Sequence, residues 1–382
     1  MNSTKTGLLK IASLCGACIA FYIGSGFATM QEIMQYNVSY GSRFWLVILV
    51  SAVVYLYTNL SFAANGNRLQ LRRGGDIYTA YCGRYIGKFF DGFSAFFCYM
   101  SFIVMCGGAN ATMTQQWGLP NGLGAVVLAT AVVATAYFGL NSILNALGML
   151  GPVIIVIILT VSTIAGLTGF PHFSAGLEAI DSGAVALVQV GGGSPILSGA
   201  SYGGFVILWF AAFMAEIGAT NRLRDVNSGM LLSSLFIFAA TALCCVALIG
   251  HLDLVADADI PSLVLAGTVS PVFSAIFAVI IFSGIYTTAV PLLWTGIGAV
   301  AKQGSLRYKL LIVAGGALGC GVACFLPYKS LVNILYGLNG YLGFILVAFM
   351  IIHDIRRMWS GRKRPAGADG QETAAEPSGK AS

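Results

Sequence analysis

The groups best suited to chemistry in this sequence are backbone groups that glycines expose within long apolar segments. Gly24-Ser25-Gly26 interrupts the apolar run 7–36, and Gly203-Gly204 interrupts the run 194–219. A helix broken inside a bilayer leaves N–H and C=O groups unpaired, which is tolerated only where a ligand, an ion or cavity water satisfies them. Both places are therefore candidate binding sites, although close helix packing also uses glycine. The second break has an alternative position around Trp209–Ala212.

A second set of oxygens lies in the apolar run 271–301. Gly284, Thr287 and Thr288 are spaced i, i+3 and i+4, so they share one face of a helix. One carbonyl and two hydroxyls on one face suit a small hard cation. The alternative is that both threonine hydroxyls bond back to the backbone of their own helix.

Glu32 is the ionisable residue that stands out inside an apolar run. Charges at membrane depth are costly, so they indicate function by default. Glu32 could hold an outer gate, with Arg43 as its partner, or carry a proton. Asp91 and Glu216 lie near span ends, where pairing with neighbouring Lys or Arg side chains is the simpler explanation.

The composition excludes several classes of protein. Of the 382 residues, 57% are hydrophobic and only 9% are charged, whereas soluble domains carry roughly a quarter charged residues. A soluble enzyme and a nucleic-acid-binding protein are therefore excluded, and the lipid bilayer is the expected partner. The chain also lacks H-E-x-x-H, G-x-S-x-G and Walker motifs. We therefore expect no enzyme activity, no cofactor and no resident metal other than a coupling Na⁺ ion.

The chain is expected to be an all-α, multi-pass membrane protein. About 20 apolar residues are needed for each crossing, and ten runs qualify: 7–36, 42–64, 88–113, 121–139, 143–168, 194–219, 227–250, 271–301, 308–326 and 330–353. Lys and Arg gather before the first span, on alternate connections and after the tenth span. Positive charge marks the inside, which predicts a cytoplasmic (inner) membrane with both termini cytoplasmic.

The spans divide into two sets of five with opposite topology. The predicted organisation is a cytoplasmic N-terminus (1–6), a first repeat (7–168), an extracellular loop (169–193), a second, inverted repeat (194–353) and a basic, then disordered cytoplasmic tail (354–382). Each repeat opens with one of the glycine-interrupted spans. Glycine-broken segments at corresponding positions of two halves indicate a transporter binding site.

The segment Ile23–Glu32, with the sequence Ile-Gly-Ser-Gly-Phe-Ala-Thr-Met-Gln-Glu, resembles the first-helix signature of the YkvI-like amino-acid permeases. These proteins belong to the amino acid–polyamine–organocation superfamily. Asn221–Val226 is similar to the segment after the sixth helix of many permeases, although their proline is absent here. The resemblance implies the LeuT-type fold, in which two inverted five-helix repeats have broken first and sixth helices.

An amino acid needs separate sites for its carboxylate and its ammonium group. Half-helix N-termini suit a carboxylate, which predicts a site at Gly24, Ser25, Gly26 and Phe27, while carbonyls at Gly203 and Gly204 would receive the ammonium. The pocket for the substrate side chain is predicted from aromatic residues near mid-membrane: Tyr99, Tyr202, Phe205, Trp209 and Tyr286. The resemblance implies that the carbonyls of Ala20 and Ile23 complete a sodium site with Gly284, Thr287 and Thr288.

The sequence therefore predicts a secondary transporter that moves a small amino acid or related zwitterion by alternating access, coupled to sodium. One alternative is a proton-coupled carrier or exchanger of another small metabolite. Another is a membrane sensor or scaffold that binds a ligand without moving it. The sequence predicts neither the identity of the small-molecule substrate nor the oligomeric state.

Overall fold

The computed structural model describes residues 2–23, 25–71, 75–138 and 144–362. The regular elements of these residues are all helical, as expected. The first half contains α1 (Asn2–Tyr22), α2 (Ser25–Thr29), α3 (Gln31–Tyr36), η1 (Val38–Arg43), α4 (Phe44–Leu69), α5 (Asp76–Trp117), α6 (Leu123–Phe138) and α7 (Leu144–Gly169).

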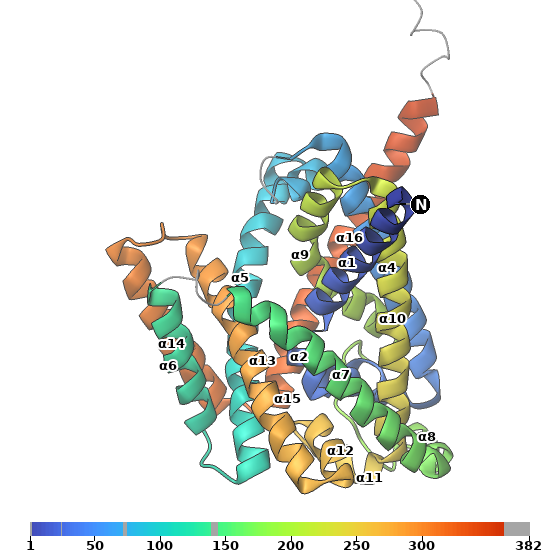
Figure 1. The fold of residues 1–382 in the computed structure, drawn as a ribbon, viewed down its shortest axis with the longest axis vertical. Helices are drawn as coiled ribbons and strands as arrows, with labels where there is room; N and C mark the ends of the chain where they lie inside the picture. Colours follow the sequence, from blue (N-terminus) through green and yellow to red (C-terminus); the bar gives the residue numbers. More distant parts are fainter. Residues whose placement is uncertain (1, 24, 72–74, 139–143, 363–382) are drawn as a thin grey trace, which may run out of the picture.

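The second half follows a connection that contains η2 (Phe170–His172) and α8 (Phe173–Asp181). Its membrane helices are joined in part by two short helices, α11 and α12, on the face opposite the N-terminus (Figure 1). The elements are α9 (Pro195–Thr220), α10 (Leu223–Gly250), α11 (Leu252–Val255), α12 (Pro261–Val269), α13 (Pro271–Gly298), α14 (Leu306–Phe325), α15 (Tyr328–Leu331), η3 (Val332–Tyr336) and α16 (Gly337–Arg362).

The helices of the described residues correspond to the ten predicted spans. Seven helical segments are long and apolar enough to cross a bilayer, and the two parts of α9 together form an eighth. The remaining two spans correspond to shorter apolar stretches, Gly7–Ile19 in α1 and Leu123–Tyr137 in α6. The prediction of an all-helical protein with many membrane spans is therefore confirmed.

Several helix ends follow from local sequence. Ser194 and Ser305 cap α9 and α14 by accepting hydrogen bonds from the backbone N–H groups of Leu197 (3.3 Å) and Tyr308 (3.1 Å). Gly83, at φ 74°, kinks α5 and separates its first turns from the span proper. This conformation is open to glycine because it has no Cβ.

Helices of the two halves pack against each other in matching pairs. The first span, α1, packs on α10, while the first span of the second half, α9, packs on α4. In the α4–α9 pair the backbones approach closely, because a Cβ on Gly66 would overlap the backbone of Ala215 and one on Gly218 would overlap that of Ala63. A separate pair, α5 and α13, lies beside these helices (Figure 1).

We predict that Gly66→Ala and Gly218→Ala destabilise the protein, because each new methyl group would force α4 and α9 apart. Overpacking of this kind costs about 1–3 kcal/mol. The measurement is the thermal unfolding midpoint of the purified protein in detergent. Gly321→Ala is the matched control, since a Cβ there meets nothing within 4 Å. Equal midpoints for all three variants would contradict the close packing.

Candidate functional site

The first membrane span is broken where the glycines predicted it. α1 ends at Tyr22 and α2 begins at Ser25, while Gly24 lies outside the described residues and the Ser25 side chain is also not described. A second interruption follows at Met30, whose φ of 60° separates α2 from α3. Positive φ is uncommon for residues other than glycine, so the tertiary structure must hold this turn in place.

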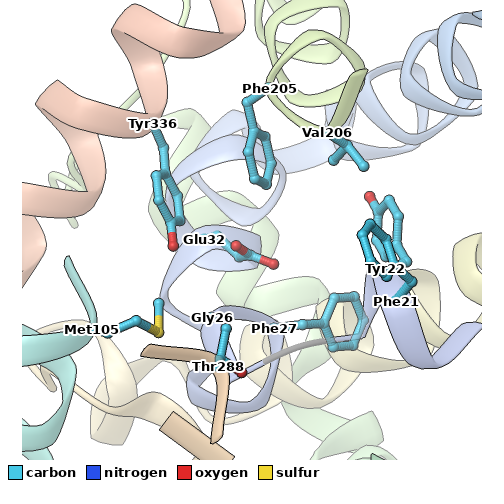
Figure 2. A pocket seen from close by; sticks show the side chains of 10 residues that line it. All are labelled: Phe21, Tyr22, Gly26, Phe27, Glu32, Met105, Phe205, Val206, Thr288 and Tyr336. Carbon is cyan, nitrogen blue, oxygen red and sulfur yellow. The ribbon is translucent and has the colours of Figure 1, made fainter. Parts of the chain in front are cut away.

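A small cavity lies beside this break. Its ten lining residues come from both halves of the chain. The volume of the cavity is about 20 Å³, which holds about one water molecule. α1 contributes Phe21 and Tyr22, and the second half contributes Phe205, Val206, Thr288 and Tyr336; the others are Gly26, Phe27, Glu32 and Met105. Figure 2 shows the carboxylate of Glu32 in the middle of these side chains.

Glu32 is the acidic side chain of the cavity, and it folds back over α2. It is only 5% exposed. The Tyr202 hydroxyl lies 3.5 Å from its Oε1 atom. A Cβ built on Gly26 would lie 3.0 Å from Oε2 and 3.5 Å from the Tyr336 hydroxyl. The carboxylate, the two hydroxyls and the start of α2 therefore converge on one point.

Aromatic rings form much of the wall around Glu32. Phe205 stacks on Tyr336, with ring centroids 5.0 Å apart and planes 11° from parallel. Tyr22 contacts Phe27 edge to face at 6.3 Å. Figure 2 shows Phe205 and Tyr336 on one side of the carboxylate and Phe27 and Tyr22 on the other.

The two glycines of the sixth span are packing positions. α9 is continuous through Gly203 and Gly204, so the prediction of a break at these residues is wrong in position. A Cβ on Gly203 would lie 2.8 Å from Val54, and one on Gly204 would overlap the carbonyl of Gly340. The helix bends by 60° between Pro195–Leu208 and Phe210–Thr220, which is the alternative position near Trp209. The Trp209 side chain is not described.

The predicted aromatic pocket residues divide into two groups. Phe205 lines the cavity and Tyr202 touches Glu32. Tyr99 and Tyr286 lie elsewhere: the Tyr99 hydroxyl donates to the carbonyl of Gly315 at 3.0 Å, and the Tyr286 hydroxyl pairs with Thr135 at 2.7 Å. These two tyrosines join helices to each other and do not line the cavity.

Sequence reasoning missed five lining residues. They are two aromatic residues just before the break, an aliphatic and a sulfur-containing side chain, and a tyrosine of the tenth span: Phe21, Tyr22, Val206, Met105 and Tyr336. Phe21 and Tyr22 could have been predicted, because only Ile23 separates them from Gly24. The others carry no signal in a chain with 16 tyrosines, 24 phenylalanines and 11 methionines.

The predicted sodium ligands lie partly at the cavity. Thr288 lines it. The hydroxyls of Thr287 and Thr288 both donate to the carbonyl of Gly284 at 2.9 Å, which is the back-bonded arrangement. Ile23 is buried directly before the break, and the Ala20 side chain is not described. In the described ranges, no group of three His, Cys, Asp or Glu residues is placed to hold a metal ion.

The expected partner of Glu32 is not at the site. Arg43 lies exposed at the end of η1 and is not among the residues that line the cavity of Glu32. Glu32 points into the cavity instead. The idea of a Glu32–Arg43 gate therefore finds no support in this arrangement.

The chain resembles solved transporters in fold. No family model matches the sequence, and no curated protein matches it. Three crystal structures of mutants of the manganese transporter from Eremococcus coleocola each match with 16% sequence identity and a TM-score of 0.51. Each match covers 90% of this chain and 78% of the other. Together with the broken first span and the bent sixth span, this likeness defines the LeuT-type fold.

We predict that Gly26→Ala impairs any function of the cavity without unfolding the protein. The new methyl group would lie 3.0 Å from Glu32 Oε2, and the end of a flexible side chain can move away at modest cost. The measurement pairs the thermal unfolding midpoint with ligand binding. Gly16→Ala is the control, because a Cβ on that α1 residue meets nothing within 4 Å. Full binding by Gly26→Ala would place the functional site elsewhere.

Proposed function

We propose that the chain is a secondary transporter that moves a small amine-bearing metabolite, an amino acid or a related zwitterion, by alternating access. The observation that carries the proposal is the buried carboxylate of Glu32 beside the broken first span. The two ends of an amino acid would find complementary groups there. The free N–H groups at the start of α2 suit its carboxylate, and Glu32 suits its ammonium group.

The small volume of the cavity is consistent with one stage of such a cycle. All six residues of α3 are buried, so in this arrangement solvent has no open route to the segment that carries Glu32. Several of its polar atoms are buried without a hydrogen-bond partner, including Oε1 of Gln31 and Oε1 of Gln35. Buried polar atoms are normally satisfied. Water or cargo would satisfy these atoms once the route opens.

The cargo of the structural relatives is manganese, but the donors here favour an organic substrate. Of the residues that line the cavity, Glu32 is the one carboxylate, and most of the others are aromatic or apolar. Manganese prefers several oxygen ligands. An amine surrounded by rings and one carboxylate fits this lining better. Such a transporter performs no covalent chemistry, so we expect no enzyme activity.

We also propose that transport is coupled to sodium, at the position that the LeuT-type arrangement implies. Gly284, Thr287 and Thr288 would supply three oxygens, and the carbonyls of Ala20 and Ile23 would supply two more. Each threonine oxygen keeps acceptor capacity after donating its hydrogen to Gly284. Uptake that is unchanged when potassium replaces sodium at fixed pH would contradict this site.

The proposed setting is a cytoplasmic (inner) membrane with both termini inside. The N-terminus and the end of α16 lie at the same end of the molecule (Figure 1). Lys and Arg are concentrated in the connections at that end, as the distribution of positive charge in membrane proteins requires. A sensor that binds without transport is the alternative, and it would show binding but no counterflow.

We predict that one amino acid or a close relative raises the thermal unfolding midpoint of the purified protein. A ligand that binds only the folded state stabilises it by about 2.7 kcal/mol at 100 times its Kd. The screen is run in sodium and in potassium buffers, and hits are tested for counterflow of labelled ligand in proteoliposomes. Ser25→Leu should abolish the shift by blocking the start of α2, with the unliganded midpoint unchanged. Binding without counterflow would reject transport.

A further inference from the structure

Glu32 is a buried carboxyl group with no positively charged side chain in the lining of its cavity. None of the ten residues that line its cavity is Lys, Arg or His. The Tyr202 hydroxyl lies 3.5 Å from the Oε1 atom of Glu32, and the Tyr336 hydroxyl lies beside Gly26. Burying an unpaired carboxylate costs several kcal/mol. In the closed state its charge must therefore be removed by a bound proton or balanced by a bound cation.

The titratable side chains around Glu32 supply no such cation. Those that interact with it electrostatically are tyrosines from its own helix and from four other elements: Tyr22, Tyr36, Tyr202, Tyr328 and Tyr336. Cys245 of α10 lies next to Tyr202. Tyrosine and cysteine are neutral at neutral pH in their usual state. Their hydroxyls and thiol can orient a ligand but cannot balance a carboxylate.

The cavity lining also favours a cation as cargo. The faces of aromatic rings attract cations, and Tyr22, Phe27, Phe205 and Tyr336 all line the space around Glu32. With no basic side chain in the lining, a ligand with a net negative charge would be repelled by the carboxylate and balanced by no positively charged side chain. A positively charged amine would meet the carboxylate and the rings together.

We propose that a proton and the ammonium group of the cargo occupy Glu32 in turn, so that the protein exchanges protons for a cationic amine. This inference rests on the proposed transport function. When the amine arrives, the Glu32 carboxyl group releases its proton to water and the resulting carboxylate pairs with the ammonium. When the amine leaves, the carboxylate takes up a proton again. An empty, charged carboxylate cannot be enclosed cheaply, so the carrier closes only with one of the two bound.

This scheme requires that cargo and proton compete for one site. The apparent affinity for the amine should fall about tenfold for each pH unit below the range in which Glu32 loses its proton, since one proton is displaced per amine bound. Cargo and protons should move in opposite directions. Transport of the cargo and a proton in the same direction would need a second proton site, and the cavity lining offers none.

The test measures proton release when a cation binds to the purified full-length protein in weakly buffered detergent solution. The probes are tetramethylammonium, choline, and two matched pairs: leucine with 3-methylbutylamine, and phenylalanine with 2-phenylethylamine. Tetramethylammonium and choline carry no proton on nitrogen, so any acidification comes from the protein. We expect about one proton per bound cation from the wild type, in line with a one-to-one exchange.

Two variants decide between a role of Glu32 and a general charge effect. Glu32→Gln should bind no cation and release no proton, whereas Glu216→Gln, the same change at an exposed position of α9, should behave as the wild type. Circular dichroism and the thermal midpoint establish that Glu32→Gln is folded. Proton release that persists in Glu32→Gln would overturn the proposal.

The two proposals fail in different ways. Binding and counterflow of leucine or phenylalanine with no proton release would overturn the exchange and leave transport intact. Absence of counterflow for every probe that binds would overturn transport itself. If no cation of the panel binds to the wild type, the assignment of a cationic cargo to Glu32 is wrong.

Discussion

The structure depends on the rule that backbone groups inside a membrane must find partners. At the interruptions of the first span, side chains meet that rule in part. The Thr29 hydroxyl donates to the carbonyl of Gly26 at 2.7 Å and also pairs with the Tyr328 hydroxyl at 3.0 Å. Because Tyr328 belongs to the tenth span, the end of the second half of the chain stabilises the break in the first. The interruption is thus a tertiary feature, even though glycine permits it.

The two interrupted helices also depend on the other half of the chain for their packing. α1 and α9, which carry the break and the bend, pack on α10 and α4 with little space between backbones. α5 and α13 supply Met105 and Thr288 to the opposite wall of the cavity. A cycle of alternating access would keep each set of helices intact and change the contact between them. The cavity lies where those sets meet, so its size would follow that movement.

The sequence predicted the fold well because each membrane span is a run of consecutive apolar residues. A crossing needs about 20 apolar residues, and every one of the ten runs has a helical counterpart. The break before Ser25 was also predictable, since polar Glu32 follows the glycines in the same run. At Gly203 the same glycine signal had another cause, because a missing side chain serves close packing as well as a broken helix.

Which side chains gather in the cavity was harder to predict. The sequence does not distinguish Tyr99, Tyr202 and Tyr286, because all three are tyrosines in apolar runs. The hydrogen-bond partners of their hydroxyls in the structure do distinguish them. Gly315 and Thr135 engage the first and the last on other helices. Tyr202 reaches Glu32 because of the helix face on which it lies, and that face follows from how α9 packs on α4 and α16. Contacts between distant helices leave no periodic signal in one sequence.

The tenth span contains a π-helical turn at Val332–Tyr336, just before α16. A π turn holds one residue more than an α turn, and each residue of an α-helix advances the direction of its side chain by about 100°. The extra residue therefore sets the rotational register of everything after it, and Tyr336 stands at the end of the turn. A chain that lacked this residue would present a different side chain to the cavity.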